Sequence, residues 1–89
     1  MSWNFRVIRK KHEVYNVYTN TEANEVMFEY YIHKVHYSDR GMLEYATDRP
    51  STPYGESIQE LYEELEMFKA ALDKPVLEWQ GNKIVEVED

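Results

Sequence analysis

The segment SIQELYEELEMFKAALDKPVL, which begins at Ser57, contains the start, the apolar stripe and the end of one amphipathic helix. Ser57 and Glu60 form a capping box: the serine hydroxyl accepts from the amide of Glu60, and the glutamate carboxylate accepts from the amide of Ser57. Pro75 cannot continue the helical hydrogen bonds, so we expect a helix over residues 58–73. Its large apolar side chains recur at spacings of three and four and share one stripe, made by Ile58, Leu61, Tyr62, Leu65, Phe68 and Leu72. We expect this stripe to be buried, so it requires an apolar surface elsewhere in the chain.

Two alternating patterns before this helix predict a long antiparallel β-hairpin over residues 3–38. The first pattern places apolar residues at alternate positions, at Trp3, Phe5, Val7, Tyr15 and Val17. The second pattern follows a turn-forming segment and comprises Val26, Phe28, Tyr30 and Ile32. It then changes phase, because Val35 and Tyr37 take the other face. A β-bulge near His33 would explain the change, and so would a strand that is apolar on both faces.

Turn signals organise the rest of the chain. The sequence Ser-Asp-Arg-Gly that ends at Gly41 favours a tight turn, so we expect a third strand over residues 42–47. The segment DRPSTPYG that follows suits an irregular crossover to the helix. Beyond Pro75, residues 76–89 suit a short terminal hairpin or an extended tail. We therefore predict a single α+β domain over residues 1–89, in which a three-stranded antiparallel β-meander packs one face against the helix.

Composition limits where this chain works and what it can do. The sequence has 89 residues, enough for one domain with one core. It contains no cysteine, which excludes disulfides, thiol catalysis and thiolate metal sites, and which is usual in cytosolic proteins. The first twenty residues have no apolar run like that of a signal peptide, and no stretch is long enough to span a bilayer. We expect a cytoplasmic protein that makes no contact with membranes.

The net charge of -7 is concentrated in the second half of the chain. Residues 1–41 carry six Lys or Arg against five Asp or Glu, whereas residues 42–89 carry four against twelve. Such a field repels phosphate backbones and favours a basic protein surface as the partner. The candidate contact is the acidic face of the helix, with Glu56, Glu60, Glu63, Glu64 and Glu66. The alternative is that these carboxylates only keep the helix in water.

Neither the histidines nor the carboxylates predict an active site or a metal site. His33 and His36 are an odd number of residues apart on a strand, so they point to opposite faces unless a bulge lies between them. His12 is the third histidine, and structural zinc sites normally combine four Cys or His ligands. The helix glutamates lie in water, whereas catalytic carboxylates need a desolvated pocket. No nucleophile elbow or phosphate-binding loop is present, so we expect neither a cofactor nor enzymatic activity.

A second candidate surface is a basic strip along the first two strands. Its binding residues are Arg9, Lys10, Lys11, Lys34 and His36. We expect Arg6, Tyr31 and His33 to lie among them on the solvent face of the sheet. Such a strip can bind RNA or an acidic peptide. Alternatively, its cations pair with neighbouring glutamates or protect an edge strand from association with other sheets.

Four motifs resemble those of a family of short uncharacterised bacterial proteins. The motifs are W-N-F-R-V-I from Trp3, I-H-K-V-H-Y from Ile32, P-Y-G-E-S from Pro53 and A-L-D-K-P-V-L from Ala71. The family pattern runs W-N-Y-R-V-I, I-H-E-V-Y-Y-D, G-E-S-x-E-E-L and A-L-D-K-P-V-L, so Lys34 stands where the pattern has Glu. The resemblance leaves out residues 14–27, which it implies to be an added length of hairpin, a protruding β-arm. The order of three strands and an acidic helix is also similar to the small domains of Hic-type antitoxins, which bind and mask a toxin.

Together these features predict a non-enzymatic binding module. We expect it to act by stoichiometric contact, as an inhibitor or regulator of a basic, nucleic-acid-handling protein; phage-borne inhibitors of bacterial defence are one such class. The first alternative is an RNA-binding protein that uses the basic strip. The second is a protein that forms homo-oligomers through the β-arm.

Overall fold

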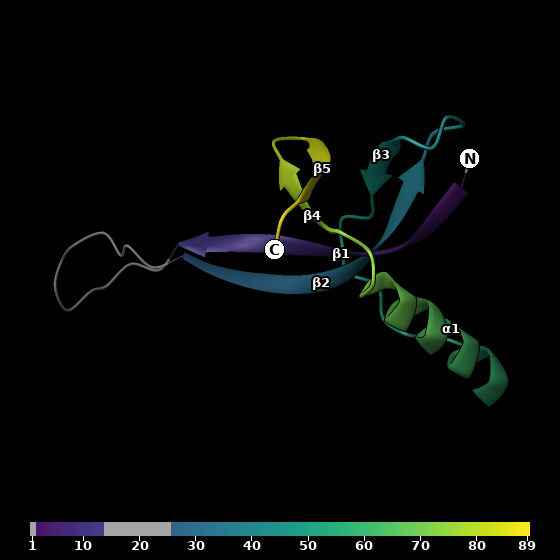
Figure 1. Cartoon of the computed structure of the whole chain (residues 1–89). Coiled ribbons are helices and arrows are strands. Elements are labelled where there is room, and N and C mark those ends of the chain that lie inside the picture. The colour runs from purple at the N-terminus through teal and green to yellow at the C-terminus, as the bar shows by residue number, and fades with distance from the viewer. Residues whose placement is uncertain (1, 14–25) are drawn as a thin grey trace, which may run out of the picture.

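The computed structural model describes residues 2–13 and 26–89, which form an α+β fold (Figure 1). In this part of the chain the elements are β1 (Ser2–Glu13), β2 (Val26–Tyr37), β3 (Leu43–Ala46), α1 (Ile58–Ala71), β4 (Val76–Gln80) and β5 (Lys83–Val87). The strands form one sheet in the order β3-β2-β1-β4-β5, in which β4 runs parallel to β1 and the other pairs are antiparallel. The predicted class is confirmed, but the sheet has two strands more than the predicted three-stranded meander.

The hairpin of β1 and β2 is the longest pairing in the described sheet. It runs without a break from Ser2 opposite Tyr37 to Glu13 opposite Val26, so β1 continues through its polar end. The tip of the predicted hairpin, including Tyr15, lies outside the described residues. The turn after β2 forms as predicted: Gly41 has a φ of +77° and its amide donates to the carbonyl of Ser38 at 2.9 Å.

The phase change in β2 arises because this strand is apolar on both faces. The bulge predicted near His33 is wrong: the register shift lies between His36 and Tyr37, in the pairing of β2 with β3. Ile32 packs toward α1, whereas Val35 packs on the opposite face of the sheet. Both faces of β2 are therefore covered over residues 31–37, which a half-buried strand would not require.

Two small cores result, one on each face of the sheet. The first lies under α1 and contains Phe5, Phe68 and Ala71, with Ile32 against them. The second contains Ile8, Val35 and Leu77, surrounded by half-buried residues of β2, β3, β4 and β5. Adjacent residues of a strand point to opposite faces, so β1 contributes to both cores. β3, β4 and β5 rise on the side of the sheet away from α1, and the edge strands β3 and β5 approach each other (Figure 1).

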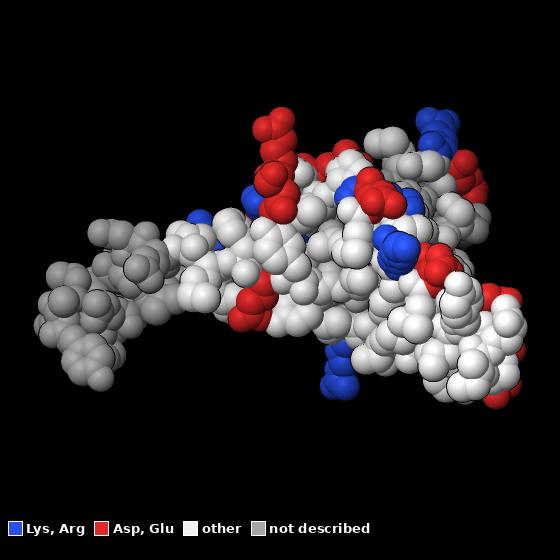
Figure 2. Space-filling model, turned by 60° about the horizontal axis from the view of Figure 1, so that its bottom comes forward, with Lys and Arg blue, Asp and Glu red and all other residues white. Residues whose placement is uncertain are grey.

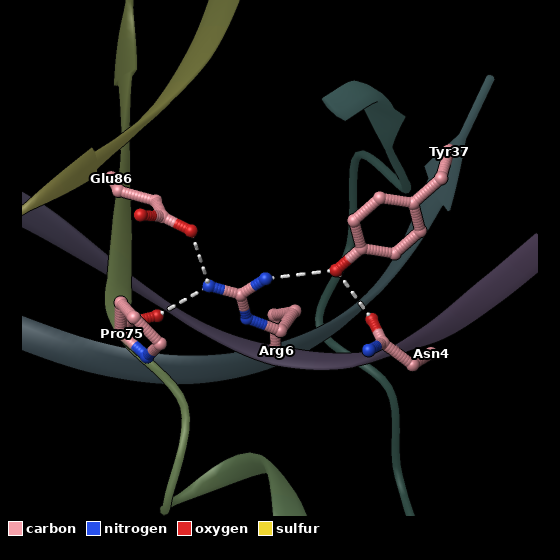
Figure 3. Close-up of polar contacts among 5 residues, drawn as sticks. All are labelled: Asn4, Arg6, Tyr37, Pro75 and Glu86. Carbon is pink, nitrogen blue, oxygen red and sulfur yellow. Dashed lines mark hydrogen bonds and ion pairs between the residues drawn. The ribbon is translucent and has the colours of Figure 1, made fainter. Parts of the chain in front are cut away.

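A buried arginine ties the strands together on the face away from α1 (Figure 3). Arg6 is only 5% exposed, and its Nη1 donates to the hydroxyl of Tyr37 at 2.8 Å. Its Nη2 donates to the carbonyl of Pro75 at 2.8 Å and lies 3.5 Å from Glu86. The Tyr37 hydroxyl in turn donates to Asn4 at 2.8 Å. The expectation that Arg6 lies on a solvent face is wrong, because the second core covers that side.

Residues 76–89 form a hairpin that belongs to the sheet. β4 and β5 pair from Val76 opposite Val87 to Gln80 opposite Lys83, and Gly81 in the turn has a φ of +67°. The hairpin alternative is therefore confirmed. Its place in the sheet was not predicted: β4 lies beside β1, with Leu77 opposite Ile8 and Glu78 opposite Arg9.

Helix α1 begins where the capping box predicts, and its buried residues, Phe68 and Ala71, lie near its C-terminal end. Ser57 Oγ accepts from the amide of Glu60 at 3.1 Å, while the Glu60 carboxylate accepts from the amide of Glu56 at 2.8 Å instead of that of Ser57. A Cβ on Gly55 would overlap the backbone of Glu60 and Leu61, so glycine is needed where the chain enters the helix. The start of α1 points away from the sheet (Figure 1). The expectation of a fully buried stripe is wrong, since of its residues only Phe68 is buried.

Candidate protein-binding surface on helix α1

Helix α1 presents three faces, because successive residues are turned by about 100° around its axis. The face toward the sheet carries its buried and half-buried residues, which are Leu61, Glu64, Phe68 and Ala71. Phe68 packs on Phe5 with ring centroids 4.5 Å apart. The other two faces are open to solvent, and they differ in chemistry.

The second face is an exposed apolar ridge, which we call the apolar seam and define as Ile58, Tyr62, Leu65 and Leu72. The exposed fractions of these side chains are 83%, 62%, 47% and 66%. In Figure 2 the region of α1 shows a broad uncharged surface with acidic side chains at its margin. Exposed apolar side chains gathered along one face of a helix make a candidate interaction site.

The third face is acidic: Glu60 and Glu63 lie on the other side of the helix from the seam, and Glu66 lies at the border of the seam beside Tyr62. Of the predicted contact residues, four are exposed and Glu64 is half-buried on the side of the sheet. Glu60 is engaged by the cap, and Glu63 accepts from the side-chain amide of Gln59 at 3.2 Å. Glu63 and Glu66 present their carboxylates to solvent. The acidic face therefore consists of Glu56, Glu60, Glu63 and Glu66, a smaller set than predicted.

The residues of the predicted basic strip are divided between the two faces of the sheet. The register places Lys34 opposite Phe5 and Lys11 opposite Phe28, which puts both lysines on the α1 side. Arg9 and His36 share that side by alternation. Lys10 faces the other way, over the rings of Tyr31 and Trp79 at 5.0 and 5.6 Å. The strip is therefore not one continuous surface.

Several of these cations are held by neighbours. Arg9 lies 3.4 Å from Glu78 and 3.5 Å from Asp89, and its guanidinium stacks on the ring of Phe28 at 4.3 Å. Lys34 lies over the ring of Trp3 at 4.2 Å. His36 stacks on Tyr45 with centroids 4.5 Å apart. This arrangement favours the structural interpretation, in which the cations pair with adjacent residues.

The histidines lie apart from one another in the fold. His33 is fully buried, and its Nδ1 donates to the carbonyl of Thr47 at 2.8 Å while its ring meets Trp79 edge-on at 5.2 Å. Burial lowers the pKa of His33, the carbonyl of Thr47 opposes that effect, and the charge of Lys10 adds to it. His36 points to the opposite face, as predicted. Within residues 2–13 and 26–89, no three histidine or carboxylate side chains come together as a metal site would require.

Two shallow hollows flank the second core. One, of about 410 Å³, lies where β4 leaves β1 and is lined by Arg9, Lys10, Lys11, Glu78 and Trp79. Its one carboxylate, Glu78, is paired with Arg9 at 3.4 Å. The other, of about 420 Å³, lies between β3 and the β4–β5 turn.

The base of the predicted β-arm is also partly apolar. Beyond the contact of β1 with β4, the far ends of β1 and β2 extend past the rest of the described sheet (Figure 1). The exposed apolar residues there are Val26, Met27, Phe28 and Tyr30. Residues 14–25, which are most of the predicted arm, lie outside the described residues, so homo-oligomers through the arm stay a prediction.

The apolar seam is the feature that reasoning from the sequence missed. The apolar stripe spans about 120° around the helix, from Phe68 to Tyr62. The sheet covers only the Phe68 side of this stripe, so the Tyr62 side stays exposed. Its spacing from Ile58 to Tyr62 to Leu65 was the available signal, because steps of four and three are those of a coiled-coil face.

Comparisons with known proteins add no family to this geometry. Among the described residues, no helix has both the length and the apolar character needed to cross a membrane. Neither the protein-family models, nor the curated proteins, nor the solved structures contain a match to this chain. The resemblances to the short bacterial proteins and to Hic-type antitoxin domains therefore stay predictions.

Proposed function

We propose that this protein is a non-catalytic binding module that contacts a basic partner protein through the acidic face of α1. The observation that carries the proposal is the placement of Glu63 and Glu66, exposed on a helix whose start projects from the sheet. A projecting helix can enter a groove of another protein without any change in the sheet. The acidic second half of the chain adds long-range attraction toward a basic surface.

A nucleic-acid-handling protein is the partner class that this charge fits. The site that such a protein uses for phosphates is a concave surface rich in Lys and Arg. Carboxylates on successive turns of α1 would occupy that site and exclude the nucleic acid. The module then acts by stoichiometric inhibition, which requires neither a cofactor nor a catalytic residue.

A single charge reversal tests this proposal. Tagged parent protein should capture a basic protein from its host. Added double-stranded DNA should compete for the basic site of that partner and release it from the tagged protein. Glu63→Lys should weaken the complex at least 10-fold, because it places a cation against a basic surface. Glu44→Lys in β3 is the matched control, since it makes the same charge change on an exposed residue away from α1.

Two outcomes would contradict the proposal. A partner retained equally by Glu63→Lys would show that the acidic face is not the contact. Capture of RNA in place of protein, lost in Lys10→Glu and Lys11→Glu and steeply weakened by salt, would establish the RNA-binding alternative instead.

A further inference from the structure

We propose that two copies of this protein pair through the apolar seam, with their α1 helices antiparallel about a two-fold axis at Leu65. This pairing centres on a different face of the helix from the proposed partner contact, and only Glu66 borders both. It also differs from self-association through the β-arm, because the described residues alone supply the interface.

The spacing along the seam is that of a helix made to face another helix. Ile58, Tyr62, Leu65, Lys69 and Leu72 follow one another in steps of four and three, the repeat that keeps one line of side chains toward a partner helix. Four of these five positions are apolar. Lys69 is the one charged residue on this line, and it lies in the last turn of α1.

The fold leaves this line uncovered. α1 reaches the sheet through Phe68 and Ala71, whereas Ile58, at 83% exposed, lies near the end that projects. Because the four apolar side chains of each seam are 47–83% exposed, complete burial of both seams would remove on the order of 1,000 Å² from water, which is the lower limit for a specific protein interface. The area is therefore sufficient for a reversible dimer.

Charge complementarity selects the antiparallel arrangement. With Leu65 of both copies at the axis, Ile58 faces Leu72 of the second copy and Tyr62 lies beside its Lys69. Helical side chains lean toward the N-terminus, so Lys69 of one copy and Glu66 of the other lean toward the same level of the pair. A parallel pair would instead place Lys69 against Lys69 and would align the two helix dipoles unfavourably.

The dimer leaves most of each acidic face available, with only Glu66 near Lys69 of the second copy. Glu63 is turned by about 140° from Ile58 around the helix, so it points away from the second copy. Each dimer then presents two acidic faces, and a partner with two basic sites would bind it more tightly than a monomer.

Sedimentation of the full chain tests the pairing. We expect a monomer–dimer equilibrium with a dissociation constant on the order of 10 μM. Leu65→Glu should raise this constant at least 100-fold, because it places two carboxylates together at the axis. Met67→Glu is the matched control, since Met67 is 43% exposed but lies outside the seam.

Neither substitution touches a core, so circular dichroism should show both variants folded. A parent protein that stays monomeric up to about 1 mM would overturn the proposal. A dimer that survives Leu65→Glu would overturn the proposal as well, and would favour self-association through the β-arm. Loss of the partner complex in Glu63→Lys with the dimer intact would separate the two proposals.

Cysteine cross-linking tests the orientation, because the chain has no cysteine of its own. Leu65→Cys should form an intermolecular disulfide, since this residue meets itself at the axis, whereas Met67→Cys should not. Ile58→Cys should cross-link to Leu72→Cys when the two variants are mixed. Efficient cross-linking of Ile58→Cys to itself would show a parallel pair and overturn the proposed geometry.

Discussion

At the scale of single residues, two polar side chains of the described chain are buried, and we expect stability to depend on both. Arg6 and His33 lie opposite each other in the β1–β2 pair, on the face covered by the second core. Their burial could not be predicted, because each alternates with apolar residues and so resembles the solvent side of a half-buried strand. Polar and apolar residues do alternate here, but around Arg6 and His33 both faces of the strands are covered.

Arg6 should be among the most costly residues to remove. Arg6→Ala leaves the hydroxyl of Tyr37 and the carbonyl of Pro75 without their donor, so we expect a loss of about 3 kcal/mol in the free energy of unfolding. Urea unfolding followed by tryptophan fluorescence measures this loss. Arg40→Ala, in the exposed turn after β2, should cost less than about 0.5 kcal/mol. Equal losses in the two variants would show that the buried guanidinium does not hold the strands together.

His33 should make stability depend on pH below neutrality. Burial lowers its pKa below the ordinary 6.5, so just below pH 6.5 the unfolded chain binds protons at this ring that the folded protein does not. The stability that the neutral ring contributes is therefore present above pH 6.5 and is lost as the pH falls toward the lowered pKa. Between pH 7.5 and 5.5, the parent should lose up to about 1 kcal/mol more than His33→Gln in urea unfolding. The other two histidines are common to both proteins, and parallel pH profiles would refute the assignment.

At the scale of elements, the helix shows which structural features could be predicted from the sequence and which could not. The cap at Ser57, the turn at Gly41 and the terminal hairpin follow from local chemistry, and they were predictable within a few residues. The side of α1 that meets the sheet could not be predicted in the same way. Periodicity shows which residues share a face of the helix, but it does not show how much of that face the rest of the chain can cover. The five residues of β4 carry no local signal of their parallel partner.

Substitutions along the stripe should therefore have unequal effects. Phe68→Ala removes a ring that packs on Phe5, and we expect it to lower the free energy of unfolding by about 3 kcal/mol. Leu65→Ala should cost less than about 1 kcal/mol, because this side chain is 47% exposed. Thermal unfolding of dilute protein, in which dimers are dissociated, compares the two. Equal destabilisation would mean that the seam is buried within one chain.

At the scale of the whole molecule, two small cores share one sheet. Composition suggested one core and a two-layer packing, and the first core follows that scheme. The second core forms only because β4, which is distant from β1 in the sequence, pairs with the edge of β1 that β2 leaves free. Such a pairing depends on contacts between distant residues, which no local pattern encodes. The candidate surface on α1 follows from the same division, since little apolar sheet remains to cover the helix.

The central position of β1 also determines when the molecule can fold. β1 is the first strand of the described chain, yet one of its neighbours, β4, and the Glu86 partner of Arg6 come from residues 76–87. A chain emerging from the ribosome can close the β1–β2 hairpin early, but the second core stays open until these residues are free. Loops this long make closure slow, since their entropy is lost before the distant contacts form. The sheet is thus completed only once residues 76–87 have been made, in a step that joins β4 and β5 to β1.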